Sequence, residues 1–421
     1  MSRVTIDAAT GVLVIDGEKM FPLGLSNAPP PGVVAPSGKD GFREIAQAGV
    51  NLIRTGRGDW SAGKIDAQIA AERALLDAAA SHGLQCWLQL GNTPDLPPPV
   101  PGQPLPVNEQ LLVKIAAAFK DHPGLAAYKG VDEPRNPFRG DNWIRPDGLV
   151  RAREKLAALD GDHPVVIIQA PRSSVAQLTP YRPAFDITGV DIFPVAYPPG
   201  EHSDSSDRDI SVVGEMTRKM LQAAGGKPVW TTLQIAWTGT VKPGTVPRFP
   251  SLHEERFMAY QAIVSGARGL MFFGGHLTQI TRPADAKAGW NWTFWELVLR
   301  PLLAELTSTA VQPALVAPAG PATVTATAKD IELVTRQTDG FLYVIAVRCG
   351  GVTTRVGFSG LPLKHDGTPV SGGQVLFEYV QEPPPPPITP GHQVFRSVSV
   401  TNGGFRDWLG PNDARVYRFA L

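Results

Sequence analysis

Short apolar runs recur along roughly the first 300 residues, and most are followed by a loop and a segment with helical spacing. The runs are nearly continuous in apolar residues, as strands buried on both faces must be, and lie at 21–25, 50–54, 84–90, 125–131, 164–169, 185–193, 228–234 and 269–273. Helical spacing is clearest at 65–81, 108–120, 149–159, 210–224 and 292–306. This alternation predicts a parallel sheet, and eight repeats predict its closure into a (β/α)8 TIM barrel.

The pattern changes at both ends of this series. Alternating residues at 4–6 and 11–14 predict a hairpin that closes one end of the barrel. Beyond residue 307 helical spacing disappears, and strand-like runs follow at 323–328, 331–336, 341–348, 354–358, 374–379, 395–400 and 414–419. We therefore expect an α/β chain with two domains: a barrel over 1–310 and a C-terminal antiparallel β-sandwich over 311–421.

The fourth apolar run carries the most informative motif. It ends in Asp132-Glu133-Pro134, and the proline stops the strand. In a closed barrel the carboxyl end of a strand is where catalytic groups gather. The same rim collects residues from the other strands, and we expect amides, acids and aromatic rings there to bind substrate: Arg54, Trp60, Asn92, Gln169, Tyr197, Gln234, Trp237, His276 and Trp290.

Composition narrows the class of ligand. The chain has 39 Lys and Arg against 39 Asp and Glu, and no basic block, which argues against nucleic acid or an anionic membrane. Carboxylates and amides bind hydroxyl groups, and indoles cover the C–H faces of sugar rings, so we expect a carbohydrate partner. We expect no metal and no cofactor. No apolar run is long enough to cross a bilayer, and no signal-peptide pattern opens the chain; this favours the cytoplasm, or the periplasm or exterior if a leader has been removed.

Several stretches resemble glycoside hydrolases of clan A, and more closely a group of bacterial glycoside-hydrolase-like barrels with a C-terminal β-domain. The resemblance is carried by Asp132-Glu133-Pro134, by Lys227-Pro228-Val229-Trp230 with Gln234, and by the stretches 248–260 and 266–270. It implies that Glu133 is a general acid and that Arg54 fits the arginine that commonly ends strand 2. Clan A places a nucleophilic glutamate at the end of strand 7, where this chain has Gln234.

Glycoside cleavage needs a proton donor and a second group on the opposite face of the sugar. We assign Glu133 as the acid, with Asp132 beside it to raise its pKa. Because Gln234 cannot attack in its amide form, the second group is either Asp191, as the base of an inverting reaction, or an N-acetyl oxygen of the substrate. Asp132 or Asp191 would orient that oxygen. The expected reaction is cleavage of an oligo- or polysaccharide.

Other interpretations of the same residues stay open. Glu133 could be a structural carboxylate paired with Arg54, and the barrel could bind sugar without cutting it. A sugar lyase or isomerase could use the same basin. Ser251 and Glu254 form a capping-box pattern, which indicates a helix start for Glu254 and Glu255 in preference to a catalytic role.

Overall fold

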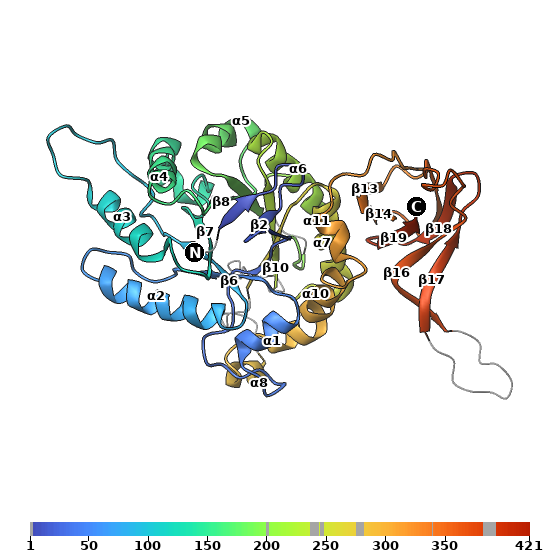
Figure 1. Cartoon of the computed structure of the whole chain (residues 1–421), viewed down its shortest axis with the longest axis horizontal. Helices are drawn as coiled ribbons and strands as arrows, with labels where there is room; N and C mark the ends of the chain where they lie inside the picture. The colour runs from blue at the N-terminus through green and yellow to red at the C-terminus, as the bar shows by residue number, and fades with distance from the viewer. Residues whose placement is uncertain are drawn as a thin grey trace.

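A computed structural model describes residues 3–198, 202–235, 244, 248–274, 282–338, 340–381 and 393–421. Within these ranges eight parallel strands close into a barrel (Figure 1). In chain order they are β4 (Leu23–Leu25), β5 (Leu52–Thr55), β6 (Gln85–Gln89), β7 (Leu125–Lys129), β8 (Val165–Gln169), β9 (Ile187–Asp191), β10 (Val229–Gln234) and β11 (Leu270–Phe273). The barrel prediction is confirmed, and each strand overlaps its predicted apolar run, with β5 ending one residue beyond it at Thr55.

Helices surround the barrel. They are α1 (Gly41–Gln47), α2 (Ile65–Ala80), α3 (Val107–Phe119), α4 (Pro146–Leu159), α5 (Val175–Leu178), α6 (Val212–Ala224), α7 (Leu252–Val264), α8 (Pro283–Lys287), α9 (Trp292–Phe294), α10 (Arg300–Leu306) and α11 (Gln312–Val316). Short helical turns add η1 (Pro137–Asn142), η2 (Thr179–Ala184) and η3 (Trp295–Leu299). The helix that directly follows the fifth strand, α5, is short.

A small antiparallel sheet packs against the barrel interior. It consists of β1 (Val4–Ile6), β2 (Leu13–Ile15) and β3 (Glu18–Met20), so the predicted hairpin is present and gains a third strand. Val4 and Leu13 join a cluster of interior residues that includes Trp87 and Trp230, whose rings meet edge to face at 5.9 Å. The interior of the barrel is therefore a packed core of side chains.

The C-terminal part forms the predicted antiparallel sandwich. One sheet has the order β12-β15-β18 and the other β13-β14-β19-β16-β17. The strands are β12 (Thr325–Ala326), β13 (Ile331–Thr338), β14 (Phe341–Arg348), β15 (Thr354–Ser359), β16 (Gly372–Gln381), β17 (Gln393–Ser399), β18 (Gly404–Leu409) and β19 (Ala414–Ala420). Strand β18 was absent from the sequence prediction, because its inward Asp407 interrupts the apolar alternation.

Strand β14 belongs to two hydrophobic clusters at once. Leu342, Val344 and Ala346 face the sandwich core, whereas Ile345 and Val347 join the large cluster that includes the barrel helices. Helix α7 lies against β13, β14 and β19 (Figure 1). The sheets thus pack on the barrel through a continuous apolar core.

Hydrogen bonds reinforce this junction. Arg256 on α7 donates to the backbone oxygen of Ala414 at 2.6 Å and forms an ion pair with Glu305 at 2.8 Å. Tyr260 donates to the same Glu305 carboxylate at 2.7 Å. The guanidinium therefore links α7, α10 and β19 in one network.

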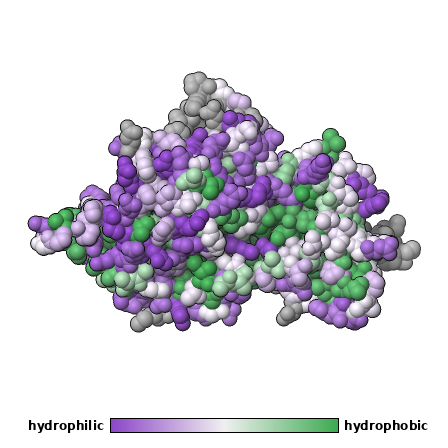
Figure 2. Space-filling view, turned by 90° about the horizontal axis from the view of Figure 1, so that it is seen from above, coloured by the Kyte–Doolittle hydropathy of each residue, from purple (hydrophilic) through white to green (hydrophobic). Residues whose placement is uncertain are grey.

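Polar residues cover much of the barrel surface in Figure 2, while hydrophobic residues are more frequent toward the right, over the sandwich. The sandwich exposes several large apolar side chains, including Val352, Leu363, Tyr379 and Trp408. Among the described residues, none of the helices combines the length and apolar character needed to span a bilayer.

The start of α7 holds two glutamates in opposite environments. The predicted capping box is confirmed: the Ser251 side chain accepts from the Glu254 backbone N–H, and Glu254 accepts from that of Ser251. Arg248 also pairs with Glu254, at 2.6 Å. Glu255 is completely buried, and neither carboxyl oxygen has a hydrogen-bond partner among the described residues. Burial, together with the charge of Glu254, raises the pKa of Glu255 well above its usual value of 4.5.

We predict that Glu255→Gln stabilises the protein increasingly as the pH rises. The folded state keeps the Glu255 proton while the unfolded chain releases it above about pH 4.5, so the parent loses stability up to the raised pKa. The advantage of the amide should grow by about 1.4 kcal/mol per pH unit across that window. Urea unfolding of both proteins from pH 5 to 8 measures it. A pH-independent difference would show that Glu255 ionises normally in the fold.

Candidate active site

The Asp132-Glu133 pair lies just beyond β7, at the rim formed by the carboxyl ends of the barrel strands. The Glu133 backbone N–H donates to the Ile168 oxygen of β8 at 2.9 Å, which ties the loop to the neighbouring strand. Glu133 has φ of 43°, in the left-handed region that side chains other than glycine seldom adopt. Such strain persists only where the surroundings enforce it and is common at functional sites.

Two buried cations face Asp132. The Lys129 ammonium lies 2.5 Å from one carboxylate oxygen, and the Arg54 guanidinium lies 3.9 Å from the other. Burial alone would raise the pKa of Asp132, but the charges of Lys129 and Arg54 and the lysine hydrogen bond bring it below its usual value. Asp132 is therefore the fixed anion of the site.

Each cation is positioned by the barrel itself. Lys129 is 1% exposed and stands over the Trp87 ring, 5.7 Å from its centre. Arg54 is 9% exposed and donates to the Ser26 backbone oxygen at 2.9 Å and to the Asn27 side-chain oxygen at 3.2 Å. Lys129 is a site residue that the sequence analysis missed, although a lysine inside an apolar strand was the available signal.

The Glu133 carboxyl is half-buried and has a different electrostatic environment. Among the described residues it forms no ion pair, and Arg54 pairs with Asp132 instead. Burial first, and then the charge of Asp132, raises the pKa of Glu133. Asn136, which the sequence pattern did not single out, donates to one carboxyl oxygen at 2.6 Å and holds the side chain in place. A larger fraction of Glu133 thus carries a proton near neutral pH.

Asp191 ends β9 and completes a group of three carboxyls. Burial, followed by the charges of Asp132 and Glu133, raises the pKa of Asp191 well above its usual value. Its register partner on β10 is Thr232, whose hydroxyl favours the ionised form. Asp132, Glu133 and Asp191 therefore share one electrostatic neighbourhood, in which Asp132 holds the negative charge and the other two retain protons more readily.

Three of the predicted binding residues have accessible or unsatisfied polar groups. Gln169 ends β8, is 1% exposed, and has neither amide atom hydrogen-bonded within the described part of the chain. A buried unpaired amide is costly and is characteristic of a group that binds ligand or water. Asn92 is exposed in the loop after β6. Tyr197 is 52% exposed, with the Arg248 guanidinium over its ring at 4.4 Å.

Three other binding predictions are corrected by the structure. Trp60 is 5% exposed, donates to the Gln89 oxygen at 2.9 Å and packs edge-on against Phe119. Trp290 is 1% exposed and packs with two other tryptophans. Neither indole offers a face to a sugar, because hydrophobic packing draws both rings into the core.

The third correction concerns Gln234. Its side chain is fully buried, accepts from the Val195 backbone N–H at 2.7 Å and donates to the Val195 oxygen at 3.1 Å. The amide thus fastens the loop after β9 onto β10, and its complete burial leaves no exposed atom for a substrate in this arrangement. The remaining predictions, Trp237 and His276, lie outside the described residues.

Trp290 nevertheless supports the site indirectly. Its indole N–H donates to the Asn27 backbone oxygen at 2.9 Å, and the Asn27 side chain accepts from both Arg54 and Arg57. In the described ranges, no group of three or more His, Cys, Asp or Glu side chains is disposed to hold a metal ion.

Comparison with known proteins identifies the fold. No family model matches the sequence, and no curated protein matches it either. A glycoside hydrolase family 5 structure from Bacteroides vulgatus is 12% identical with a TM-score of 0.60, covering 99% of this chain and 93% of that one. A structure described as a glycoside hydrolase is 11% identical with a TM-score of 0.59, covering 99% and 96%.

An alpha-amylase from Anoxybacillus is also similar, with 10% identity, a TM-score of 0.51 and coverage of 96% and 99%. At such identities the likeness shows architecture, and the roles of individual side chains have to be argued from this chain's own geometry. The chain has a (β/α)8 barrel fold with an additional C-terminal β-sandwich, and it shares this fold with solved glycoside hydrolases.

Proposed function

We propose that this protein is a glycoside hydrolase that cleaves an O-glycosidic bond of an oligo- or polysaccharide, with Glu133 as the general acid. The observation that carries the proposal is the contrast between two adjacent carboxyls. Asp132 is held as an anion by Lys129 and Arg54, while burial and that anion raise the pKa of Glu133. A protonated acid beside a fixed anion suits a reaction that protonates a leaving oxygen and develops positive charge on the sugar.

Asp132 has a second task in this mechanism. As the sugar approaches its oxocarbenium-like transition state, an anion at the rim of the barrel stabilises the developing positive charge. Lys129 and Arg54 keep Asp132 ionised while Asn136 holds Glu133, so the charges are arranged before substrate binds. Gln169, with its unsatisfied amide, would then bind a hydroxyl of the sugar.

The attacking group is best supplied by the substrate. Gln234 is bound to Val195, and Asp191 retains its proton more strongly than an ordinary aspartate, which weakens it as a base near neutral pH. The carbonyl oxygen of an N-acetyl group next to the reacting carbon can attack that carbon without an enzyme base. Anionic Asp132 can accept a hydrogen bond from the N–H of the same acetamido group. We therefore place substrate assistance ahead of inversion through Asp191.

Glu133→Gln should lower kcat/KM about 10²–10⁴-fold on glycosides with a sugar leaving group, because protonation of that group is lost. On 4-nitrophenyl glycosides of the same sugar, whose leaving group needs no proton, the loss in glycosidic cleavage should be about tenfold or less. Release of reducing sugar and of nitrophenol measures the two reactions, with exposed Glu296→Gln as the matched control. Equal losses on both substrates would rule out the acid role, and an ultraviolet-absorbing unsaturated product would identify a lyase.

Asp132→Asn should shift the alkaline limb of the pH–rate profile to lower pH. The anion at Asp132 raises the pKa of Glu133, so its removal lowers that pKa, and the acid then loses its proton at a lower pH. The profile of kcat/KM from pH 4 to 9 for the parent and variant tests this. An unchanged alkaline limb would mean that a group other than Glu133 supplies the proton.

Substrate assistance predicts a strong preference for acetamido sugars. A 4-nitrophenyl N-acetylhexosaminide should be cleaved about 10²-fold or more faster than the matching hexoside, since the nucleophile is held beside the reacting carbon. The anomeric configuration of the product, followed by NMR, should be retained. Efficient cleavage of hexosides with inversion would instead assign the base to Asp191.

A further inference from the structure

A cavity of about 310 Å³ lies beside the loop that carries Glu133. It is formed by the segment after β7, the start of α4, and α5 with η2. Its lining residues are Arg135, Trp143, Arg145, Pro146, Asp147, Gln177, Pro180 and Tyr181. Arg135 follows Glu133 by two residues, and Arg139 in the same loop donates to the backbone oxygens of Asp132 and Glu133. A ligand in this cavity would therefore contact the segment that positions the acid.

Two arginines in the lining are oriented by one tryptophan. The guanidinium carbons of Arg135 and Arg145 lie 4.5 Å and 5.2 Å from the centre of the Trp143 ring. Across the described parts of the chain, neither guanidinium forms an ion pair with a carboxylate. Contact with an aromatic ring holds a guanidinium while leaving its in-plane N–H donors available, and this fork matches a carboxylate.

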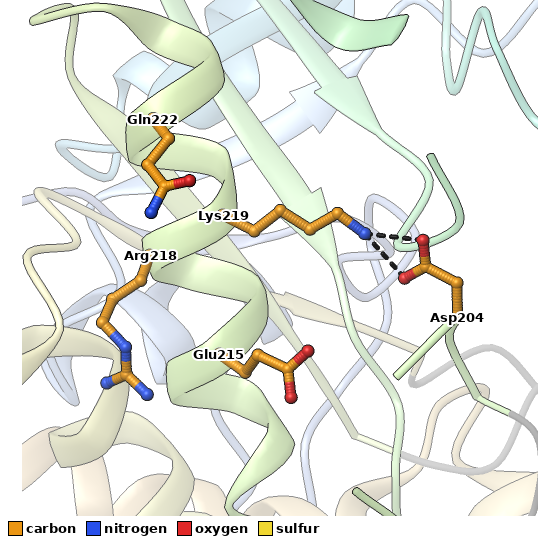
Figure 3. Close-up of a pocket in the computed structure, with 5 residues that line it drawn as sticks. All are labelled: Asp204, Glu215, Arg218, Lys219 and Gln222. Carbon is orange, nitrogen blue, oxygen red and sulfur yellow. Dashed lines mark hydrogen bonds and ion pairs between the residues drawn. The ribbon is translucent and has the colours of Figure 1, made fainter. Parts of the chain in front are cut away.

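A second cavity, of about 370 Å³, lies beside α6 and serves as a comparison, because charged side chains that line it have hydrogen-bond or ion-pair partners in the protein. Lys219 donates to both carboxylate oxygens of Asp204, at 2.6 and 2.7 Å (Figure 3). Glu215 accepts from Ser205, and Arg218 pairs with Glu332 at 3.0 Å. The cations of that cavity are already paired with carboxylates of the protein, whereas among the described residues Arg135 has only the Tyr181 hydroxyl as a polar side-chain partner and Arg145 has no carboxylate partner.

The remaining lining groups also favour an anion. Helix α4 begins at Pro146, and its N-cap residue Arg145 provides no side-chain cap, so the positive end of the helix dipole lies at Arg145 and keeps its uncapped backbone N–H groups. Burial raises the pKa of Tyr181 to about 12, although the charge of Arg135 and its hydrogen bond to this hydroxyl act to lower it, and the protonated hydroxyl donates to the Ile144 oxygen at 2.6 Å. Asp147 is the lining carboxylate that opposes the two cations.

We propose that this cavity binds the carboxylate of a uronic acid unit of the substrate, adjacent to the unit that is cut. Two guanidinium forks supply the charge, and Gln177 and the edge of Trp143 can contact the sugar ring. The identification of the ligand as a sugar rests on the proposed glycosidase function. The carboxylate itself follows from two arginines that have no carboxylate partner within the described residues.

The test is direct binding to the full-length protein, measured by calorimetry with glucuronate and galacturonate. Glucose and galactose are the neutral counterparts, and sodium sulfate is the anion without a sugar. At least one uronate should bind about tenfold or more tighter than its neutral counterpart and than sulfate. Arg135→Gln or Arg145→Gln should weaken that binding about tenfold or more, the effect of losing a charged hydrogen bond.

Two further variants separate this site from general charge and from misfolding. Asp147→Asn should tighten uronate binding, because it removes a like charge from the lining, and Arg218→Gln in the α6 cavity should leave it unchanged. Equal binding of sulfate, equal binding of the neutral sugars, no binding of either uronate, or insensitivity to both arginine variants would each overturn the proposal. Uronate binding should persist in Glu133→Gln, so a failure of the hydrolase assignment and a failure of this one are distinguishable.

Discussion

The contact between the Lys129 ammonium and the Asp132 carboxylate organises the chemistry of this molecule. A lysine almost wholly removed from water is tolerated because a carboxylate lies 2.5 Å away and an aromatic ring lies beneath it. The ion pair fixes which carboxyl is charged. The neighbouring carboxyls then ionise less readily, since a further negative charge would be repelled in a poorly solvated place. One buried cation thus decides which group can donate a proton.

Residues that lie behind the three carboxyls hold this arrangement of charges in place. The filled interior of the barrel supports Lys129 through Trp87, and the tryptophans behind the last barrel strands support Arg54 through Asn27. The loop after β9 is fastened by Gln234. Residues that resemble ligand-binding groups in the sequence therefore act one layer behind the site, where they set the positions of the charges.

Much of the architecture could be predicted from apolar pattern, because strands buried on both faces leave a continuous signal and α7 starts at a recognisable capping box. The positions of Asp132, Glu133 and Asp191 at strand ends followed from the same pattern. The burial of Trp60 and Trp290 could not be predicted from that pattern. A tryptophan in a loop can face solvent or the core, and tertiary packing decides which. Lys129 was overlooked because its strand is otherwise apolar, and β18 because Asp407 is buried against Arg396 and Tyr417.

The two faces of strand β14 belong to two different hydrophobic cores, and this limits how such two-domain chains can evolve by recombination. Where modules are joined by a tether, recombination can exchange one for another without loss of folding. Here the wall of the sandwich is also part of the packing around α7, so a transplanted sandwich would leave apolar helix surface uncovered. Barrel and sandwich should accordingly be inherited together and accumulate compensating substitutions across their shared wall.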